Sequence, residues 1–444
     1  MSRPQGRLTA WLANAPQPAF TLFAMLAAFS TYFCMYAFRK PFSAAKFADF
    51  STTFFGIEYG LKTVLVVSQL IGYTLSKYLG VKFCSEIKPQ RRAMALVGLI
   101  VWAEATLVAF ALMPLDWKFV PLFLNGLSLG MVWGLVVWYL EGRKTSELLL
   151  AGLSCSFIIA SDMTKDFARA LMSPPEWASP LLGSGVSEMW MPAVTGAIFL
   201  PVYLLSVWLL SQVPQPTADD QAARSVRETM DNAHRLAFVK HFLWGLVSLL
   251  ITYFFLTAYR DYRDNFIVEL FDSLNYKYED EKNKTIITQS GMCVSFGVMG
   301  MLAALNAIKD NRRGLLAAFA IMTGGLLLLG GSTLLHRAGA ISGFWWMTAC
   351  GLGSYLAYVP YGSVLFDRII AYTRVVGTAV FAIYVADAIG YSGSIITLLV
   401  QDRLKYSHLE FFEAFTLALS VFGTFMMLLS CAYFLTRKSG HHAP

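Results

Sequence analysis

The sequence predicts an all-α polytopic membrane protein with twelve transmembrane helices. Three observations lead to this fold class: few charged residues, apolar runs of helical length, and the same organisation in both halves of the chain. Of the 444 residues, 56% are hydrophobic and 14% are charged, whereas soluble domains carry about 25% charged residues. The mean hydropathy is +0.54. Because such a chain has too little polar surface to face water on all sides, we expect lipid around it.

The apolar runs are continuous over about twenty residues, the length that crosses a bilayer as a helix. They lack the alternation of apolar and polar residues that is typical of membrane β-barrels, and only helices and closed barrels satisfy their backbone in hydrocarbon. We predict spans at 18–39, 59–80, 93–114, 119–140, 149–171, 191–212, 241–262, 287–308, 314–335, 342–366, 374–400 and 410–436.

One long polar segment, 213–240, separates the first six spans from the last six. The sequence therefore predicts an N-terminal six-helix bundle over 1–212, a cytoplasmic linker over 213–240, and a C-terminal six-helix bundle over 241–444. Short loops join most of the other spans.

The formal charge of +7 comes from basic residues in short loops, so it indicates topology and not a nucleic-acid partner. With both termini in the cytoplasm, the inner loops hold about twice as many lysines and arginines as the outer ones. An even number of spans also requires both termini on one side. We expect a monomer surrounded by lipid, in a bacterial inner membrane.

The six cysteines lie singly, without the CxxC spacing of metal sites, and are interpreted as reduced packing residues. We predict no metal site and no cofactor. The six histidines lie in loops or at span ends, so the sequence offers little support for an enzyme.

The two halves resemble each other in sequence. Aligning Gly126 of the fourth span with Gly351 of the tenth also aligns Arg143 with Arg368. The runs IKPQRR and IKDNRR follow the second and eighth spans. This pattern is similar to the parallel six-helix repeats of major facilitator transporters, which bind substrate between their halves near the middle of the membrane.

Charged residues inside spans identify candidate functional positions, because a charge at mid-bilayer costs about 3 kcal/mol or more without a partner or a hydrated cavity. Arg39 closes the first span and either snorkels to the outer edge or faces a cavity. Lys77 lies near the inner end of the second span. Glu104, in the middle of the third span, is either structurally paired or a proton-coupling residue.

The fifth span carries a stripe of alternating charge at positions i, i+3, i+4 and i+7. Its members are Asp162, Lys165, Asp166 and Arg169. They either line a hydrated cavity as a self-compensated face, or they are the solvated end of a span that stops near Ile159.

Two further charged positions lie in the C-terminal half. Arg260, Arg263 and Asp264 share a face of the seventh span, and form either an anion site, through the planar guanidinium, or an ion-pair cluster at the outer edge. Asp387 in the eleventh span is either a protonatable carboxyl or a helix–helix hydrogen-bonding group.

Several of these runs resemble the organophosphate:phosphate antiporters of the major facilitator superfamily. They are the run Tyr36–Ala37–Phe38–Arg39–Lys40–Pro41–Phe42 in the first span, Ser76–Lys77–Tyr78–Leu79–Gly80 in the second, Gly126 to Trp133 in the fourth, and Arg260 in the seventh. The fifth span departs from that family, because it has no histidine near Ser154 and carries the charged stripe instead.

The resemblance implies that Arg39 and Arg260 hold an anion from opposite halves, with Lys77 assisting. We therefore expect a secondary transporter of a small organic anion, for example a phosphorylated one. Asp387 and Glu104 are the proton-coupling candidates, and Tyr36, Trp133 and Tyr358 are candidate cavity-lining residues.

The alternative is a proton-coupled carrier of a larger or zwitterionic solute, such as a peptide-like compound, a nucleoside or a siderophore. A membrane enzyme or a transporter-like sensor is the third hypothesis.

Overall fold

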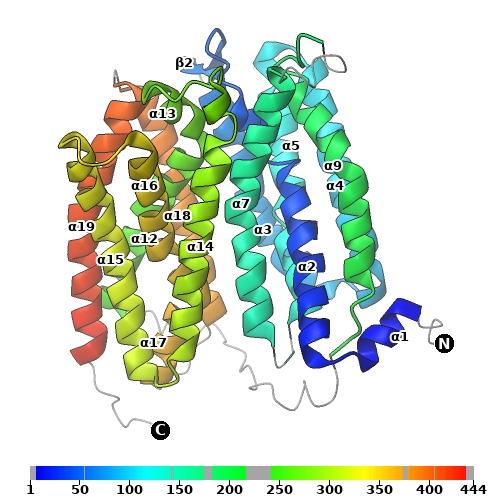
Figure 1. Cartoon of the computed structure of the whole chain (residues 1–444), viewed down its shortest axis with the longest axis vertical. Coiled ribbons are helices and arrows are strands. Elements are labelled where there is room, and N and C mark those ends of the chain that lie inside the picture. Colours follow the sequence, from blue (N-terminus) through cyan, green and yellow to red (C-terminus); the bar gives the residue numbers. More distant parts are fainter. Residues whose placement is uncertain are drawn as a thin grey trace. The chain divides into compact units, whose positions relative to one another are not determined.

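The computed structural model describes residues 7–54, 56–141, 143, 145–174, 183–216, 242–373, 379–404 and 406–436. The chain divides into two compact units, Met1–Ser225 and Val226–Pro444. Most of the predicted linker lies outside the described residues. Each unit is a bundle of long helices that run side by side (Figure 1).

In the first unit, helices occupy all six predicted spans. They are α2 Gln17–Tyr36, α3 Leu61–Glu86, α4 Arg92–Leu112, α5 Phe119–Leu129 with α6 Val132–Leu140, α7 Ser146–Met172, and α9 Met191–Ser211. The short elements are helix α1 Arg7–Asn14, the 3-10 helices η1 Pro41–Ala44, η2 Pro89–Arg91 and η3 Leu115–Trp117, and the strands β1 Ser51–Phe54 and β2 Ile57–Gly60.

The second unit also has a helix in each predicted span. These helices are α12 Leu243–Asn265, α14 Ile286–Ala307, α15 Asn311–Arg337, α16 Gly343–Ser363 with α17 Leu365–Thr373, α18 Ala379–Gln401, and α19 His408–Thr436. Helix α13 Ile267–Ser273 and the 3-10 helix η4 Glu281–Asn283 lie between α12 and α14.

The helices pair in the same way in both units. In the first unit α2 packs on α7 and α9, and α4 packs on α5 and α9, while α3 packs on α5. In the second unit α12 packs on α18 and α19, α15 packs on α16 and α19, and α14 packs on α16. The long helices at the same position in the two units therefore pack against corresponding neighbours. The two halves are structural repeats.

Two details differ from the sequence predictions. Residues 59 and 60 belong to an antiparallel hairpin, in which Ser51 pairs with Gly60, so the second span begins only at Leu61. The fourth span of each unit is broken, after Leu129 in the first unit and after Ser363 in the second. Glycine at position 130 and proline at position 360 stand at these breaks, and both residue types weaken a continuous helix.

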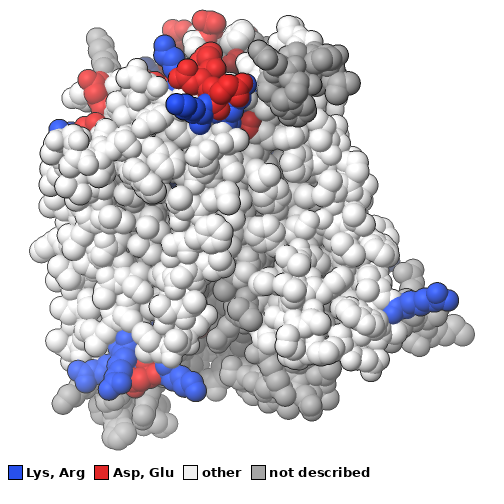
Figure 2. Space-filling model, viewed as in Figure 1, with Lys and Arg blue, Asp and Glu red and all other residues white. Residues whose placement is uncertain are grey.

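The outer surfaces of the helices are apolar. Large side chains such as Met94, Trp208, Val421 and Phe425 are about half exposed or more, and charged side chains on the face seen in Figure 2 gather at the helix ends. Among the described residues, eight helices are long and apolar enough to cross a membrane. Helices α3, α7 and α16 are outside this set, and Val385–Gln401 of α18 is a shorter apolar helix. Together these features define an integral, multi-pass membrane protein.

Glycines allow close helix crossings. A Cβ atom at Gly126 of α5 would lie 2.0 Å from the carbonyl oxygen of Gln69 on α3. In the second unit, a Cβ atom at Gly353 of α16 would lie 2.6 Å from the carbonyl oxygen of Gly325 on α15. Small residues of this kind let membrane helices approach closely.

Candidate functional site

The position of Arg39 follows from how helix α2 ends. The helix stops at Tyr36, which leaves the following carbonyl groups without helical partners. The side-chain amide of Asn125, on α5, donates to the carbonyl of Phe38 at 3.1 Å, and that of Gln69, on α3, donates to the carbonyl of Arg39 at 2.9 Å. Gln69 also donates to Asn125 Oδ1 at 2.8 Å. This buried amide network fixes the backbone of Arg39.

The guanidinium of Arg39 lies over two tyrosine rings. Its Cζ atom is 3.9 Å from the ring centre of Tyr73 and 5.6 Å from that of Tyr36. The ammonium of Lys77 lies 5.6 Å from the centre of the same Tyr73 ring. Two cations thus lie near one aromatic ring; a single contact of this kind is worth roughly 0.5–2 kcal/mol.

Further aromatic side chains contact one another beside Arg39 and Lys77. Tyr32 contacts Tyr36 edge-on at 5.6 Å and Trp133 at 4.8 Å, and Trp133 continues the chain to Phe157 at 6.2 Å. The structure therefore brings Arg39, Lys77, Tyr36 and Trp133 into one region of the first unit, which we call the N-terminal cluster together with Tyr32 and Tyr73.

Sequence reasoning did not identify Tyr73, Gln69 or Asn125. Helical spacing could have found two of them, because Gln69, Tyr73 and Lys77 follow one another at intervals of four and share a face of α3. Asn125 carried no comparable signal, since a lone asparagine in an apolar span reveals its partners only after folding.

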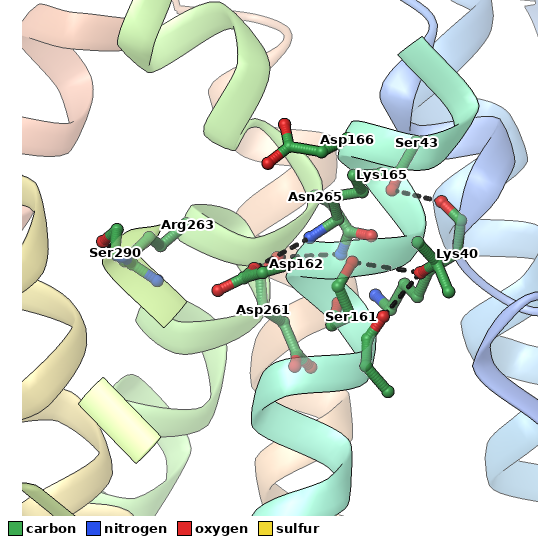
Figure 3. Close-up of polar contacts among 12 residues, drawn as sticks. Lys40, Ser43, Ser161, Asp162, Lys165, Asp166, Asp261, Arg263, Asn265 and Ser290 are labelled. Carbon is green, nitrogen blue, oxygen red and sulfur yellow. Dashed lines mark hydrogen bonds and ion pairs between the residues drawn. The ribbon is translucent and has the colours of Figure 1, made fainter. Parts of the chain in front are cut away.

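The four charged side chains of the α7 stripe are buried in the protein. Helix α7 continues past Ile159 to Met172. The exposed fractions are 4% for Asp162, 0% for Lys165, 5% for Asp166 and 4% for Arg169. Lys165 Nζ lies 3.8 Å from Asp162 Oδ1, and Arg169 Nη1 lies 3.6 Å from Asp166 Oδ1. Figure 3 shows the first three of these side chains following one another along the helix.

Arg260 in the second unit also lies against tyrosines, but it has an acidic neighbour. Its Cζ atom is 4.1 Å from the ring centre of Tyr358 and 6.0 Å from that of Tyr355. Its Nη2 atom donates to Asp261 Oδ1 at 2.7 Å. The second carboxylate oxygen of Asp261 accepts from the Ser394 hydroxyl of α18 at 2.7 Å.

Arg263 points to a different part of the second unit. Its Nη2 atom donates to the carbonyl of Met347 at 3.0 Å and lies 3.5 Å from the Ser290 hydroxyl (Figure 3). A Cβ atom at Gly351 would lie 2.8 Å from the guanidinium carbon, so this glycine provides the space that Arg263 occupies. Asp264 follows it on the helix and is half-buried. Arg263 thus ties α12 to α14 and α16.

The two proton-coupling candidates have different surroundings. Asp387 on α18 accepts a hydrogen bond from the Tyr253 hydroxyl of α12 at 2.7 Å. Glu104 on α4 lies against Gly196 of α9, where a Cβ atom would be 2.0 Å from Oε2. Among the described residues, Glu104 Oε2 has no hydrogen-bond partner. Asp387 is therefore linked to a polar network in its unit, whereas Glu104 lies in an apolar helix contact.

Comparison with solved structures identifies the fold. The chain is similar to a bacterial homologue of the human lysosomal transporter Spinster, with 12% identity, 96% of this chain and 100% of that chain covered, and a TM-score of 0.59. A D-xylose–proton symporter is 13% identical, with 96% of this chain and 98% of that chain covered and a TM-score of 0.58. The nucleoside transporter NupG is 14% identical, with 94% of this chain and 99% of that chain covered and a TM-score of 0.57. The protein is therefore a polytopic membrane protein of the major facilitator fold, as predicted.

Within that class the chain belongs to the family of unknown function DUF5690, whose model matches residues 41–437. A search of curated proteins finds no match. The narrower resemblance to the organophosphate:phosphate antiporters stays a prediction.

Proposed function

We propose that the protein is a secondary transporter that moves a small organic anion by alternating access, and that the N-terminal cluster is its main anion site. The observation that carries this proposal is the pair of cations on one ring. Arg39 and Lys77 both lie over Tyr73, within a helix bundle that lipid surrounds.

The chemistry of the cluster suits an oxyanion. A guanidinium offers a planar pair of N–H donors that matches carboxylate or phosphate, and an ammonium adds a compact second charge. The Tyr73 ring holds the plane of Arg39, while Gln69 and Asn125 hold its backbone. An anion that enters between Arg39 and Lys77 therefore meets donors that are already oriented.

Arg260 has a different role in this proposal. Since its charge is balanced by Asp261 at 2.7 Å, it offers directed donors without net charge. Such a pair suits the uncharged polar part of a solute, for example a hydroxyl or an amide.

The same Asp261 favours the second candidate function, a proton-coupled carrier of a zwitterionic or nucleoside-like solute. A carboxylate beside Arg260 attracts a cationic group on the solute. Two of the similar structures are a nucleoside transporter and a D-xylose–proton symporter, and the likeness to them is one of fold.

Flux measurement distinguishes these candidates. The purified protein is reconstituted into vesicles loaded with glycerol 3-phosphate, and uptake of radiolabelled glycerol 3-phosphate is measured against excess phosphate, lactate, uridine or a dipeptide. The proposal predicts competition by the anions and indifference to uridine and the dipeptide. Competition only by uridine or the dipeptide would favour the alternative. Ligand binding without flux of any solute would indicate a sensor instead.

We also propose that the protein lies in a bacterial inner membrane with both termini in the cytoplasm, as the distribution of basic loop residues favours. Cysteine labelling of exposed Lys46 and Lys309 positions, which lie in loops on opposite predicted sides, tests this orientation.

A further inference from the structure

Helices α12 and α18 are joined by two hydrogen bonds that run in opposite directions. Asp387 of α18 accepts from Tyr253 of α12, and Asp261 of α12 accepts from Ser394 of α18, each at 2.7 Å. Asp387 and Ser394 are seven residues apart on α18, so they share one face of this helix. Each hydrogen bond therefore pairs a carboxylate from one helix with a hydroxyl from the other.

Small residues make this contact possible. A Cβ atom at Gly390 would lie 2.8 Å from the Tyr253 ring and 2.7 Å from the Thr257 hydroxyl. A Cβ atom at Gly393 would lie 2.6 Å from the Phe254 carbonyl oxygen. Because α18 has glycine at both positions, Tyr253 reaches Asp387 directly.

Tyr253 also connects Asp387 to Arg260. Its ring stacks on that of Tyr358, with centres 5.3 Å apart and planes inclined by 21°. The Tyr358 ring also contacts the guanidinium of Arg260, whose Cζ atom is 4.1 Å from the ring centre. Asp387, Tyr253, Tyr358 and Arg260 thus form a continuous chain of contacts across α18, α12 and α16, which we call the tyrosine relay.

We propose that Asp387 binds the transported proton and that the tyrosine relay couples this proton to the anion affinity of the transporter; this inference rests on the proposed function. Ionised Asp387 is a charge-assisted acceptor for Tyr253 and adds negative potential near Arg260. Protonation removes that charge and weakens the hydrogen bond that holds Tyr253. Because Asp261 balances the charge of Arg260, the loss of the second negative charge makes the potential at Arg260 more positive, which favours an anionic solute.

The sign of the effect follows from linkage. If protonated Asp387 favours anion binding, bound anion favours protonation by the same factor. The proton then travels with the anion, which makes the protein a proton–anion symporter. Within the relay, Tyr253 also interacts with Tyr391 of α18, and Arg260 also interacts with Asp261 of α12, Tyr355 of α16 and Tyr391. Helix α17, which packs on α18, carries Asp367, Arg368 and Tyr372. Arg368 and Tyr372 donate to the carbonyls of Ile308 and Leu435.

The experiment measures anion binding to the full-length protein at mildly acidic and mildly alkaline pH. Sulfate is the first probe, because its charge is constant over this range and any pH dependence then belongs to the protein. Glycerol 3-phosphate is the second. We expect wild-type affinity to be on the order of tenfold higher at acidic pH.

The variants separate the proton site from the relay. Asp387→Asn should bind sulfate with the same affinity at both pH values. Tyr253→Phe keeps the ring stack and loses the hydrogen bond, so the pH dependence should fall to about threefold or less, below the range typical of site-to-site coupling. Glu104→Gln is the control, because it changes a membrane carboxyl outside the relay and should retain the dependence.

Full pH dependence in Asp387→Asn would overturn the proton site, and full dependence in Tyr253→Phe would overturn the relay. Equal sulfate affinity of the wild type at both pH values would contradict the proposed coupling, while the proposed anion transport would still stand. If the wild type binds neither probe at either pH, the proposed function fails, and this inference fails with it.

Discussion

Each unit has an arginine against a tyrosine ring near the C-terminal end of its first long helix, yet the two units surround that arginine with opposite charges. Arg39 shares the ring of Tyr73 with a second cation, Lys77. Arg260 lies under Tyr358 and donates to Asp261 at 2.7 Å. The fifth helices differ in the same way, because α7 pairs its charges within itself and α18 offers its Asp387 and Ser394 to α12.

This difference indicates how one architecture supports two tasks. A repeat fixes which helices pack together, and a few polar substitutions then decide the local potential. In our account, the first unit supplies a fixed positive site, whereas the second supplies a charge-balanced group whose hydrogen bonds change with protonation. The predictions below test that contrast.

The largest effect is expected at the buried stripe of α7. Asp162→Asn leaves Lys165, which is fully buried, without its neighbouring carboxylate, and breaking such a pair costs about 3–5 kcal/mol. We expect a marked fall in the apparent unfolding temperature in detergent. The matched control is Glu413→Gln. It removes the carboxylate that accepts two hydrogen bonds from the half-exposed Arg337 through one oxygen, and should cost at most about 1 kcal/mol.

An equal change in both variants would show that the α7 stripe is solvated and contradict its role as a buried wall. The double variant Asp162→Asn with Lys165→Met should recover much of the lost stability, because it leaves no buried charge at that pair.

Glycine substitutions should have intermediate effects on stability. Gly126→Ala forces a methyl group against the Gln69 carbonyl, and Gly353→Ala forces one against the Gly325 carbonyl. Overpacking of this kind costs about 1–3 kcal/mol. Gly98→Ala and Gly324→Ala are controls, because nothing lies within 4 Å of a Cβ atom at either position. An equal fall of the unfolding temperature in the controls would show that the loss does not come from these two helix crossings.

The smallest effects are expected for anion affinity at the secondary positions. Lys77→Gln removes the second cation near Tyr73, and we expect affinity to fall about tenfold, equivalent to about 1.4 kcal/mol. Arg260→Lys keeps the charge balanced by Asp261 and should cost about threefold. Isothermal titration with glycerol 3-phosphate provides both values. The reverse order would place the main anion site in the second unit.

Much of this structure could be predicted from the sequence. Apolar length predicted all twelve helical positions, because the bilayer imposes the same length on every span. The hairpin at 51–60 and the breaks near Gly130 and Pro360 were not predicted, since they depend on loop pairing and local packing. Of the candidate site residues, charge inside a span pointed to Arg39, Lys77, Arg260 and Asp387, but not to what each contacts.

The partners could not be predicted, because Tyr73, Tyr253 and Tyr358 resemble the other aromatic residues of the spans. Arg260 and Arg263 are three residues apart with the same side chain, yet one lies under Tyr358 and the other reaches the Met347 carbonyl. Only the packing of α12 against α16 and α14 separates these two roles.

The central claim is that Arg39 binds the anion through its planar guanidinium. Its most direct test is glycerol 3-phosphate binding to wild type, Arg39→Lys and Arg92→Lys, where Arg92 also lies over an aromatic ring of the first unit, 4.6 Å from the centre of Trp138. We predict that Arg39→Lys weakens binding by about 30-fold or more, since a lysine lacks the paired donors, and that Arg92→Lys binds like wild type. Wild-type affinity in Arg39→Lys, or equal losses in both variants, would contradict the claim.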